Sequence, residues 1–323
     1  MQLGAHVFPD PVVFLAPMAG VSDRPFRILC RRLGASAAVS EMITSDTRLW
    51  RTDKSRNRMD HTAEPSPRIV QLLGNDPWAL AHAARDNVAR GAQVIDLNLG
   101  CPAKKVCRTA AGSALLADEA LVERLLRALT DAVEVPITLK MRLGVDRDHM
   151  NAPRIARIAQ DAGVSMLSVH GRTRACGYRG QTDYDGIARV VEAVDIPVLA
   201  NGDITSPEQA RAVLHRTGAA GIMIGRAAQG RPWLPGQIRA ALAGQTVPPA
   251  PRGEVLRQFV RAHIAELHRQ YGPEQGLRIA RKHIGWYLEC HRPGADRRSI
   301  LEIADATRQL AAVDVLFSAS SGS

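Results

Sequence analysis

RIVQLLGNDPWALAHAARDNVARGAQVIDLNLG, at residues 68–100, is the stretch that decides the predicted fold. It opens and closes with a short apolar run (68–74 and 94–100), and the residues between the runs follow a helical period. This helical segment, 76–91, has an apolar face made of Leu80, Ala84 and Val88. Because the runs are continuously apolar rather than alternating, they are typical of parallel strands buried on both faces, and the stretch predicts a strand, a helix and a second strand.

The same unit recurs along the chain. Apolar runs lie at 13–19, 37–42, 68–74, 94–100, 137–144, 166–172, 197–203 and 221–227, and amphipathic segments separate most of them. Eight such units over about 230 residues predict an α/β fold, a (β/α)8 TIM barrel. The alternative, a doubly wound open sheet, normally carries G-x-G-x-x-G after its first strand. The chain has no such motif, since the glycines of 218–225 have the wrong spacing and the segment ends on a strand.

Beyond the eighth run the pattern changes to helices alone. A proline-rich segment, 248–251, precedes two amphipathic segments, 254–271 and 274–291, which Gly272-Pro273 separates. We therefore expect a barrel domain over residues 1–245 and a small all-helical domain over 246–317. The serine-rich end, 318–323, is expected to be a disordered tail.

The composition is that of a folded protein of the cytoplasm. The 323 residues are 46% hydrophobic, which is enough for a full core. The five cysteines include no C-x-x-C pair, so we expect neither a disulfide framework nor a metal site. No apolar run approaches the ~18 residues of a membrane span, and the N-terminus lacks the order of a signal peptide. We expect a cytoplasmic protein without membrane attachment.

The net charge of +10 favours a polyanionic partner such as nucleic acid. Part of the arginine excess is compatible with codon bias, because only five of the 42 basic residues are lysine. Position is more informative than the total. Residues 251–300 hold ten basic and five acidic side chains, so half of the net charge lies in the predicted helical domain.

Candidate site residues, most of them polar, stand where the predicted strands end, which is where barrel enzymes keep their active sites. They are Pro17 to Gly20, Glu41, Gln71, Asn98, Cys101, Lys140, His170, Asn201 to Asp203, and Gly225-Arg226. Cys101 follows the fourth strand and fits a proton donor, since an ordinary thiol is mostly protonated at neutral pH. The alternative for Cys101 is a small packing residue.

The last two strands predict a phosphate site. Gly202 and Gly225 let backbone N–H groups approach an anion, and Arg226 adds a cation. Lys140 lies among apolar neighbours and needs a counter-charge, which the anionic edge of a reduced flavin would provide. An ion pair with Asp96 or Glu41 and a Schiff-base role are the alternatives for this lysine.

These residues belong to motifs that resemble the bacterial tRNA-dihydrouridine synthases, most closely the B type. The motifs are APMAGVSDRPFR (16–27), VSEM (39–42), NLGCPAKKV (98–106), GSALL (112–116), HGRTR (170–174), NGDI (201–204) and MIGRA (223–227). The resemblance covers nearly everything from Gly4 to Phe317. It implies an FMN enzyme that uses NADPH to reduce the C5=C6 bond of a uridine in tRNA.

The resemblance also implies roles for individual residues. FMN would be bound by Pro17, Met18, Ala19, Gln71, Lys140, His170, Asn201, Gly202, Asp203, Gly225 and Arg226. Hydride would pass from the flavin N5 to C6 of the uracil, and Cys101 would protonate C5. The tRNA would contact Asn98, Lys104, Lys105, Arg172, Arg174, Arg278, Arg281 and Lys282. The B type implies position 17 of the D-loop as the target, and we expect a monomer.

Two other functions are compatible with parts of the sequence. A flavin-dependent barrel dehydrogenase acting on a small molecule shares the fold and cofactor, but it predicts neither the basic helical domain nor the Gly-Cys-Pro loop with two lysines. A non-catalytic RNA-binding barrel would not require Cys101 or Lys140.

Overall fold

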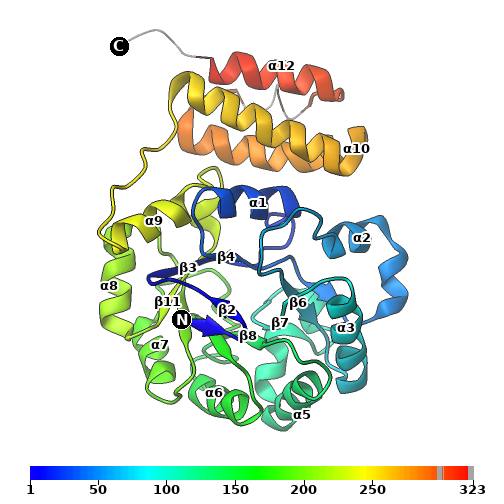
Figure 1. Cartoon of the computed structure of the whole chain (residues 1–323), viewed down its shortest axis with the longest axis vertical. Coiled ribbons are helices and arrows are strands. Elements are labelled where there is room, and N and C mark those ends of the chain that lie inside the picture. Colours follow the sequence, from blue (N-terminus) through cyan, green and yellow to red (C-terminus); the bar gives the residue numbers. More distant parts are fainter. Residues whose placement is uncertain (297–299, 301, 319–323) are drawn as a thin grey trace.

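The computed structural model describes residues 1–296, 300 and 302–318, and it confirms a parallel barrel followed by a helical region (Figure 1). The barrel strands run in parallel in the order β4-β3-β11-β10-β9-β8-β7-β6-β5. Their bounds are β3 (Val12–Leu15), β4 (Ala37–Ala38), β5 (Ile43–Thr44), β6 (Ile69–Leu73), β7 (Val94–Leu99), β8 (Ile137–Arg142), β9 (Met166–His170), β10 (Val198–Asn201) and β11 (Gly221–Ile224).

The barrel closes through its second strand, which the structure divides into β4 and β5. β4 pairs with β3, and β5 pairs with β6, so the two edges of the sheet belong to one short segment. Between them, Val39 forms an isolated bridge with Ile69, and the Ser40 hydroxyl accepts a hydrogen bond from the Gln71 backbone N–H at 3.0 Å. The run 37–42, expected to be one strand, therefore contains a break that turns Glu41 toward the barrel mouth.

Helices surround the strands as the amphipathic segments predict. They are α1 (Arg24–Arg32), α2 (Asp53–Met59), α3 (Pro77–Ala89), α4 (Lys104–Cys107), α5 (Glu119–Thr130), α6 (Ala152–Asp161), α7 (Tyr184–Val191), α8 (Pro207–Thr217) and α9 (Leu234–Leu242), with short 3-10 turns at Thr47–Arg51, Gly112–Ala117 and Arg226–Ala228. Side-chain caps start several of them. Asp76 accepts from the Ala79 N–H and Asp118 from the Leu121 N–H, which satisfies backbone donors of the first turn.

A hairpin that the sequence analysis did not predict covers one end of the barrel. It consists of β1 (Gln2–Leu3) and β2 (His6–Val7), which are antiparallel. Leu3 and the following Phe8 are buried in an apolar cluster with residues that begin the strands, among them Val12 and Val94. The hairpin thus closes the N-terminal end of the barrel and leaves the opposite end for a functional site.

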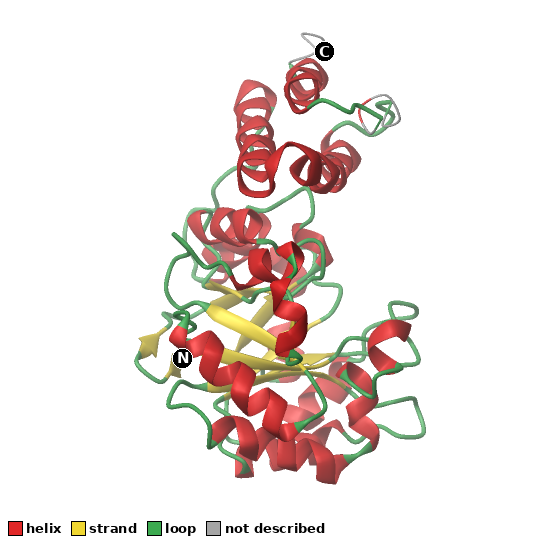
Figure 2. Cartoon of the chain, turned by 90° about the vertical axis from the view of Figure 1, so that its right-hand side faces the viewer, coloured by secondary structure: helices red, strands yellow, loops and turns green. Residues whose placement is uncertain are grey.

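The C-terminal region is helical and stacks on one side of the barrel (Figure 2). Within the described residues, this region contains α10 (Gly253–His291) and α12 (Ala306–Phe317), which share an apolar core. Gly272 interrupts α10 with a φ of 76°, and Pro273 follows, so the predicted separation of two helices at this point is confirmed. Of the expected disordered tail, 318–323, residues 319–323 lie outside the described residues.

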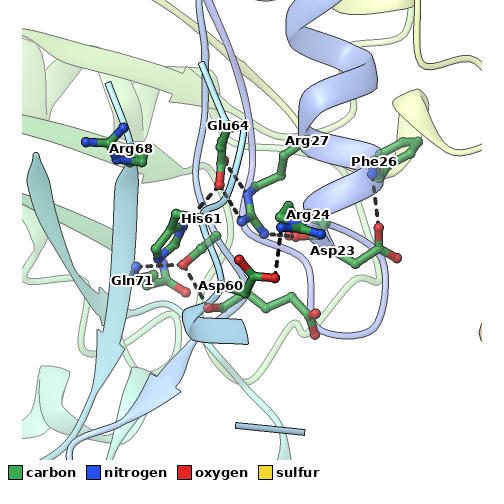
Figure 3. Close-up of polar contacts among 12 residues, drawn as sticks. Asp23, Arg24, Phe26, Arg27, Asp60, His61, Glu64, Arg68 and Gln71 are labelled. Carbon is green, nitrogen blue, oxygen red and sulfur yellow. Dashed lines mark hydrogen bonds and ion pairs between the residues drawn. The ribbon is translucent and has the colours of Figure 1, made fainter. Parts of the chain in front are cut away.

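Buried ion pairs fix the start of α1 against the segment that follows α2 (Figure 3). Arg27 binds Glu64 through two N···O contacts of 2.6 Å, and Arg24 binds Asp60 at 2.8 Å. His61 contacts the same Glu64 carboxylate at 3.0 Å. These contacts fix α1 and with it the loop that precedes the helix. Residues 17–20 of that loop lie at the barrel mouth. Within the described residues, we find no helix with both the length and the apolar character needed to cross a membrane.

Candidate active site

A cavity of about 400 Å³ lies at the C-terminal ends of the barrel strands. Nine of the eleven residues expected to bind a cofactor line it: Pro17, Met18, Lys140, His170, Asn201, Gly202, Asp203, Gly225 and Arg226. The other two lie apart. Ala19 lines a neighbouring cavity one residue farther along the loop, and Gln71 is buried below the site with 1% of its surface exposed.

Lys140 extends from β8 to the floor of this cavity. Its ammonium group donates to the Asn201 Oδ1 atom at 3.1 Å, and the Asn201 amide donates in turn to the Met223 carbonyl. Burial, with the nearby charge of Arg142, lowers the pKa of Lys140 to about 8. The lysine forms no ion pair with Asp96 or Glu41 in the described part of the chain, so the site keeps a buried cation whose charge a bound anion would stabilise.

His170, at the end of β9, is buried beside Lys140. Burial, together with four surrounding cationic side chains, lowers the pKa of His170 to about 2. The imidazole is therefore neutral at physiological pH, with one N–H donor and one nitrogen acceptor. A neutral ring can hydrogen-bond a polar cofactor without adding charge to a site that already holds Lys140.

The loops after β10 and β11 form a cradle for an anion. Gly202 has a φ of 133°, and a Cβ there would lie 2.7 Å from Thr182 Cγ2, so glycine is required for this close turn. The backbone N–H groups of Gly202, Asp203, Gly225 and Arg226 have no acceptor within the described residues. The Arg226 guanidinium lies beside them and binds Asp203 at 2.9 Å. Free N–H groups beside a cation are an arrangement that can bind a phosphate, so the expected phosphate site stays a prediction that this geometry favours.

Cys101 lies on the loop after β7, and three side chains fix this loop. The side-chain oxygen of Asn98, Oδ1, accepts hydrogen bonds from the backbone N–H groups of Gly100 and Cys101 at 3.0 Å each. Arg142 Nε donates to the Gly100 carbonyl at 2.7 Å, and the Ser113 hydroxyl donates to the Cys101 carbonyl at 2.8 Å. The thiol is partly exposed, and the fixed backbone gives it a defined position.

The electrostatic surroundings keep the Cys101 thiol protonated. Burial raises the pKa of Cys101, although the Ala103 N–H and the charges of Arg142 and Lys140 oppose this effect. A nearby cation makes a thiol more acidic, but burial outweighs that effect at Cys101. A protonated thiol suits a proton donor rather than a nucleophile.

A hydrogen-bonded chain connects Asn98 to the barrel interior. The Asn98 amide donates to Gln71 Oε1 at 2.7 Å, and Gln71 donates to Asp96 at 2.8 Å. Thr138 donates to the other Asp96 oxygen, yet burial raises the pKa of Asp96 to about 6. In this structure, Gln71 and Asn98 thus position the Cys101 loop, and most of their hydrogen-bonding capacity is used within the protein.

Some of the side chains expected to contact tRNA are exposed, and others are hydrogen-bonded within the protein. Lys104 and Lys105 on α4, and Arg278 and Lys282 on α10, are exposed, while Arg174 is partly exposed. Arg281 is partly buried and donates to the Ile303 carbonyl at 2.9 Å.

Arg172 does not occupy the surface position that the sequence analysis expected. Only 3% of Arg172 is exposed, because its guanidinium binds Asp203 and the carbonyls of Arg179 and Gly180. It therefore supports the phosphate cradle from beneath.

Two residues of the site were missed by sequence reasoning. Arg142 is buried two positions after Lys140 on β8, and the period of a strand puts both on the same face, which was the available signal. Tyr178 lines the cavity, and the guanidinium carbons of Arg142 and Arg226 lie 5.5 and 4.6 Å from its ring centroid. Nothing in the local sequence indicates this cation–π arrangement, because it forms only when distant loops meet.

A separate buried group lies where the barrel meets α10. Asp23, His263 and His283 bring their potential metal-ligand atoms within 4.8 Å of one another. His283 lies 3.2 Å from Asp23 Oδ2, and His263 contacts the Tyr287 hydroxyl at 3.0 Å. The His283–Asp23 contact joins α10 to the barrel, whereas the His263–Tyr287 contact lies within α10. The expectation that the chain holds no metal stays a prediction.

Comparison with known proteins gives consistent relatives. A sequence model of the family described as dihydrouridine synthase (Dus) matches residues 14–320. The tRNA-dihydrouridine synthase B of Xanthomonas axonopodis pv. citri is 55% identical over 305 residues, which cover 94% of this chain and 92% of the relative. The proteins of the same name from Yersinia pestis and Escherichia coli K12 are 55% and 51% identical over 319 residues, covering 98% of this chain and 99% of each relative.

Proposed function

Because the chain belongs to the dihydrouridine synthase family, we propose that it reduces the C5=C6 bond of a uridine in tRNA, with FMN as its resident cofactor and NADPH as the reductant. The observation that carries the proposal is the arrangement of the barrel mouth: a buried lysine and a phosphate cradle share one cavity, and a protonated thiol lies close enough for Lys140 to affect its pKa.

The residues of the cavity fit FMN in charge and in hydrogen-bonding groups. A volume of about 400 Å³ lies within the range of small-molecule sites. The free N–H groups of Gly202 and Gly225, with Arg226, would hold the phosphate, and Lys140 would bind the electron-rich edge of the ring. The neutral His170 would donate or accept one hydrogen bond. Pro17 and Met18 supply apolar contact for the ring, while Ala19 extends their loop.

Held by Lys140 and the loops of Gly202 and Gly225, FMN would supply the hydride that reduces C6 of the uracil. The protein supplies the proton. Cys101 gives its thiol proton to C5, and the raised pKa keeps that proton in place until the base arrives. Asn98 and Gln71 keep the Cys101 backbone fixed, so the thiol meets the base without a loop rearrangement.

The basic side chains around the mouth would hold the RNA backbone. Lys104, Lys105 and Arg174 lie on the barrel loops, and Arg278, Arg281 and Lys282 lie on α10. A uridine must leave its stack before it can meet a flavin, and cations on both sides of the mouth would stabilise the deformed strand. We propose position 17 of the D-loop as the target, residues 1–245 as the catalytic domain and 246–317 as the tRNA-binding domain. We further propose that the protein acts as a monomer in the cytoplasm.

The test compares tRNA from cells with and without this protein by primer extension, which stops at dihydrouridine after alkaline cleavage. Loss of the signal at position 17 alone supports the proposal, and an unchanged pattern overturns it. The purified protein should be yellow, and FMN should be released on denaturation. If FMN is present but no tRNA position changes, the alternative of a small-molecule dehydrogenase on the same barrel is favoured.

A further inference from the structure

A second cavity, of about 300 Å³, lies beside the cofactor cavity and between the barrel and α10. The two cavities share one loop. Pro17 and Met18 line the first, and Ala19 and Gly20 line the second. Consecutive Cα atoms are about 3.8 Å apart, so neighbouring groups of one extended ligand can occupy both cavities.

Polar side chains without partners face this second cavity. Asn57 on α2 and Tyr271, Gln275 and Lys282 on α10 line it, and their side chains make no hydrogen bond with any residue that the structure describes. These donors and acceptors are partly buried or exposed and are not used within the described protein, so they are available to a ligand with several hydrogen-bonding groups.

Two acidic side chains, Glu41 and Asp23, line the cavity, and they differ in how fully their carboxylate oxygens are already hydrogen-bonded. Glu41 is 7% exposed, and its Oε1 atom accepts from the Gly20 N–H at 2.7 Å and from Arg58 at 2.9 Å. Its Oε2 atom has no partner among the described residues, so one carboxylate oxygen is left to accept from a ligand. Asp23, which also lines the cavity, is already bound by His283 and the Phe26 N–H.

The remaining residues of the cavity provide apolar surface and one cation. Ile279 and the ring of Tyr271 provide flat apolar surface on the α10 side. Lys282 Nζ lies 3.1 Å from where a Cβ of Gly20 would be, and so places a cation beside the loop that the two cavities share. A planar polar ring in the cavity, joined through a phosphate near Lys282, would use each of these groups.

Resting on the proposed function, we propose that this cavity binds the base of a nucleotide adjacent to the reduced uridine in the same RNA strand. The base is held by Asn57, Gln275 and the free Glu41 oxygen, which favours a base with an exocyclic amine. The enzyme thereby extracts two consecutive bases, and the second one helps to select which uridine reaches Cys101. A carboxylate that accepts from a base amine is an established mode of base recognition.

The experiment measures kcat/KM for dihydrouridine formation in tRNA transcripts in which the base on the 5′ or the 3′ side of the target is replaced by an abasic ribose. For the wild-type enzyme, one of the two transcripts should react roughly tenfold more slowly than intact tRNA. The variant Asn57→Ala with Gln275→Ala should lose a similar factor on intact tRNA and no further activity on that abasic transcript. Gln270→Ala is the control, because Gln270 lies on α10 five residues before Gln275 but outside the cavity.

If neither abasic transcript reacts more slowly with the wild-type enzyme, or if the loss is as large in the double variant, the inference is overturned. Equal FMN content and thermal stability of all variants exclude misfolding, and Gln275→Glu provides a second probe that keeps the side-chain volume. Failure of the proposed function is distinguishable, since the wild-type enzyme would then form no dihydrouridine in any transcript.

Discussion

Replacing Glu64 with glutamine tests the buried ion pair that fixes the start of α1. Arg27 and Glu64 are 1% and 3% exposed, and two contacts of 2.6 Å join them. Burial alone raises the pKa of Glu64, but the charge and hydrogen bonds of Arg27, aided by His61, hold it at about 2. Compared with an ordinary glutamate pKa of ~4.3, this corresponds to ~3 kcal/mol of stability.

The sign follows from proton linkage. A carboxyl group whose pKa is lower in the folded state stabilises the fold above the unfolded pKa, and this contribution is lost as the pH falls through the folded pKa. The contribution of Glu64 should therefore be complete above about pH 4.3 and disappear toward about pH 2. At neutral pH, Glu64→Gln also leaves the Arg27 charge buried without a counter-charge, which costs roughly 3–5 kcal/mol.

The assay is urea unfolding followed by circular dichroism from pH 7 down to the lowest pH at which the fold persists. The difference in the free energy of unfolding between wild type and Glu64→Gln should be largest near neutral pH and should narrow below about pH 4.3. The control is Asp53→Asn, which breaks the exposed pair with Arg56 and should leave stability unchanged within error. A difference that is absent at pH 7, or that does not narrow in acid, would refute the reasoning.

Three further outcomes are expected. Cys101→Ala should lose about 10²- to 10⁴-fold in turnover while FMN content stays unchanged, and a fully active variant in the tRNA assay would assign the proton donor elsewhere. Because the pKa of Lys140 is about 8 in the free protein, the affinity for FMN should fall as the pH rises above that value. Fluorescence titrations from pH 7 to 9.5 should show this fall for the wild type and not for Lys140→Met. Lys104→Ala with Lys105→Ala should weaken tRNA binding and reduce the slope of log affinity against log salt by about two, and an unchanged slope would place the RNA away from α4.

The sequence predicts the barrel because strands buried on both faces must be continuously apolar, and seven of its strands follow that pattern closely. The second strand departs from it for a local reason. Ser40 uses its side chain to bind the Gln71 backbone, so the chain leaves the regular ladder between β4 and β5. A hydroxyl that replaces a ladder contact 31 residues away has no signature in the local pattern.

Selecting the residues that follow each predicted strand identified most of the candidate site, because parallel strands of a barrel end at the same rim. A position at a strand end does not reveal which residues of the rim bind one another. Arg172 illustrates this limit: an arginine after a strand is typical of an exposed cation, but Asp203 and two carbonyls satisfy it in the interior. The same reasoning did not identify Tyr178 or the second cavity, which depend on contacts between loops and between domains.

The hairpin β1–β2 closes the end of the barrel opposite the site, and this has a kinetic consequence. A molecule that reaches Lys140 from the rim must also depart over the rim. With the proposed substrates, NADPH and the extracted uridine would have to use this one entrance in turn, so oxidation of NADPH and reduction of the uridine would occur as separate half-reactions. Parallel lines in double-reciprocal plots, and inhibition of NADPH oxidation by excess tRNA, would be the signature of this shared entrance.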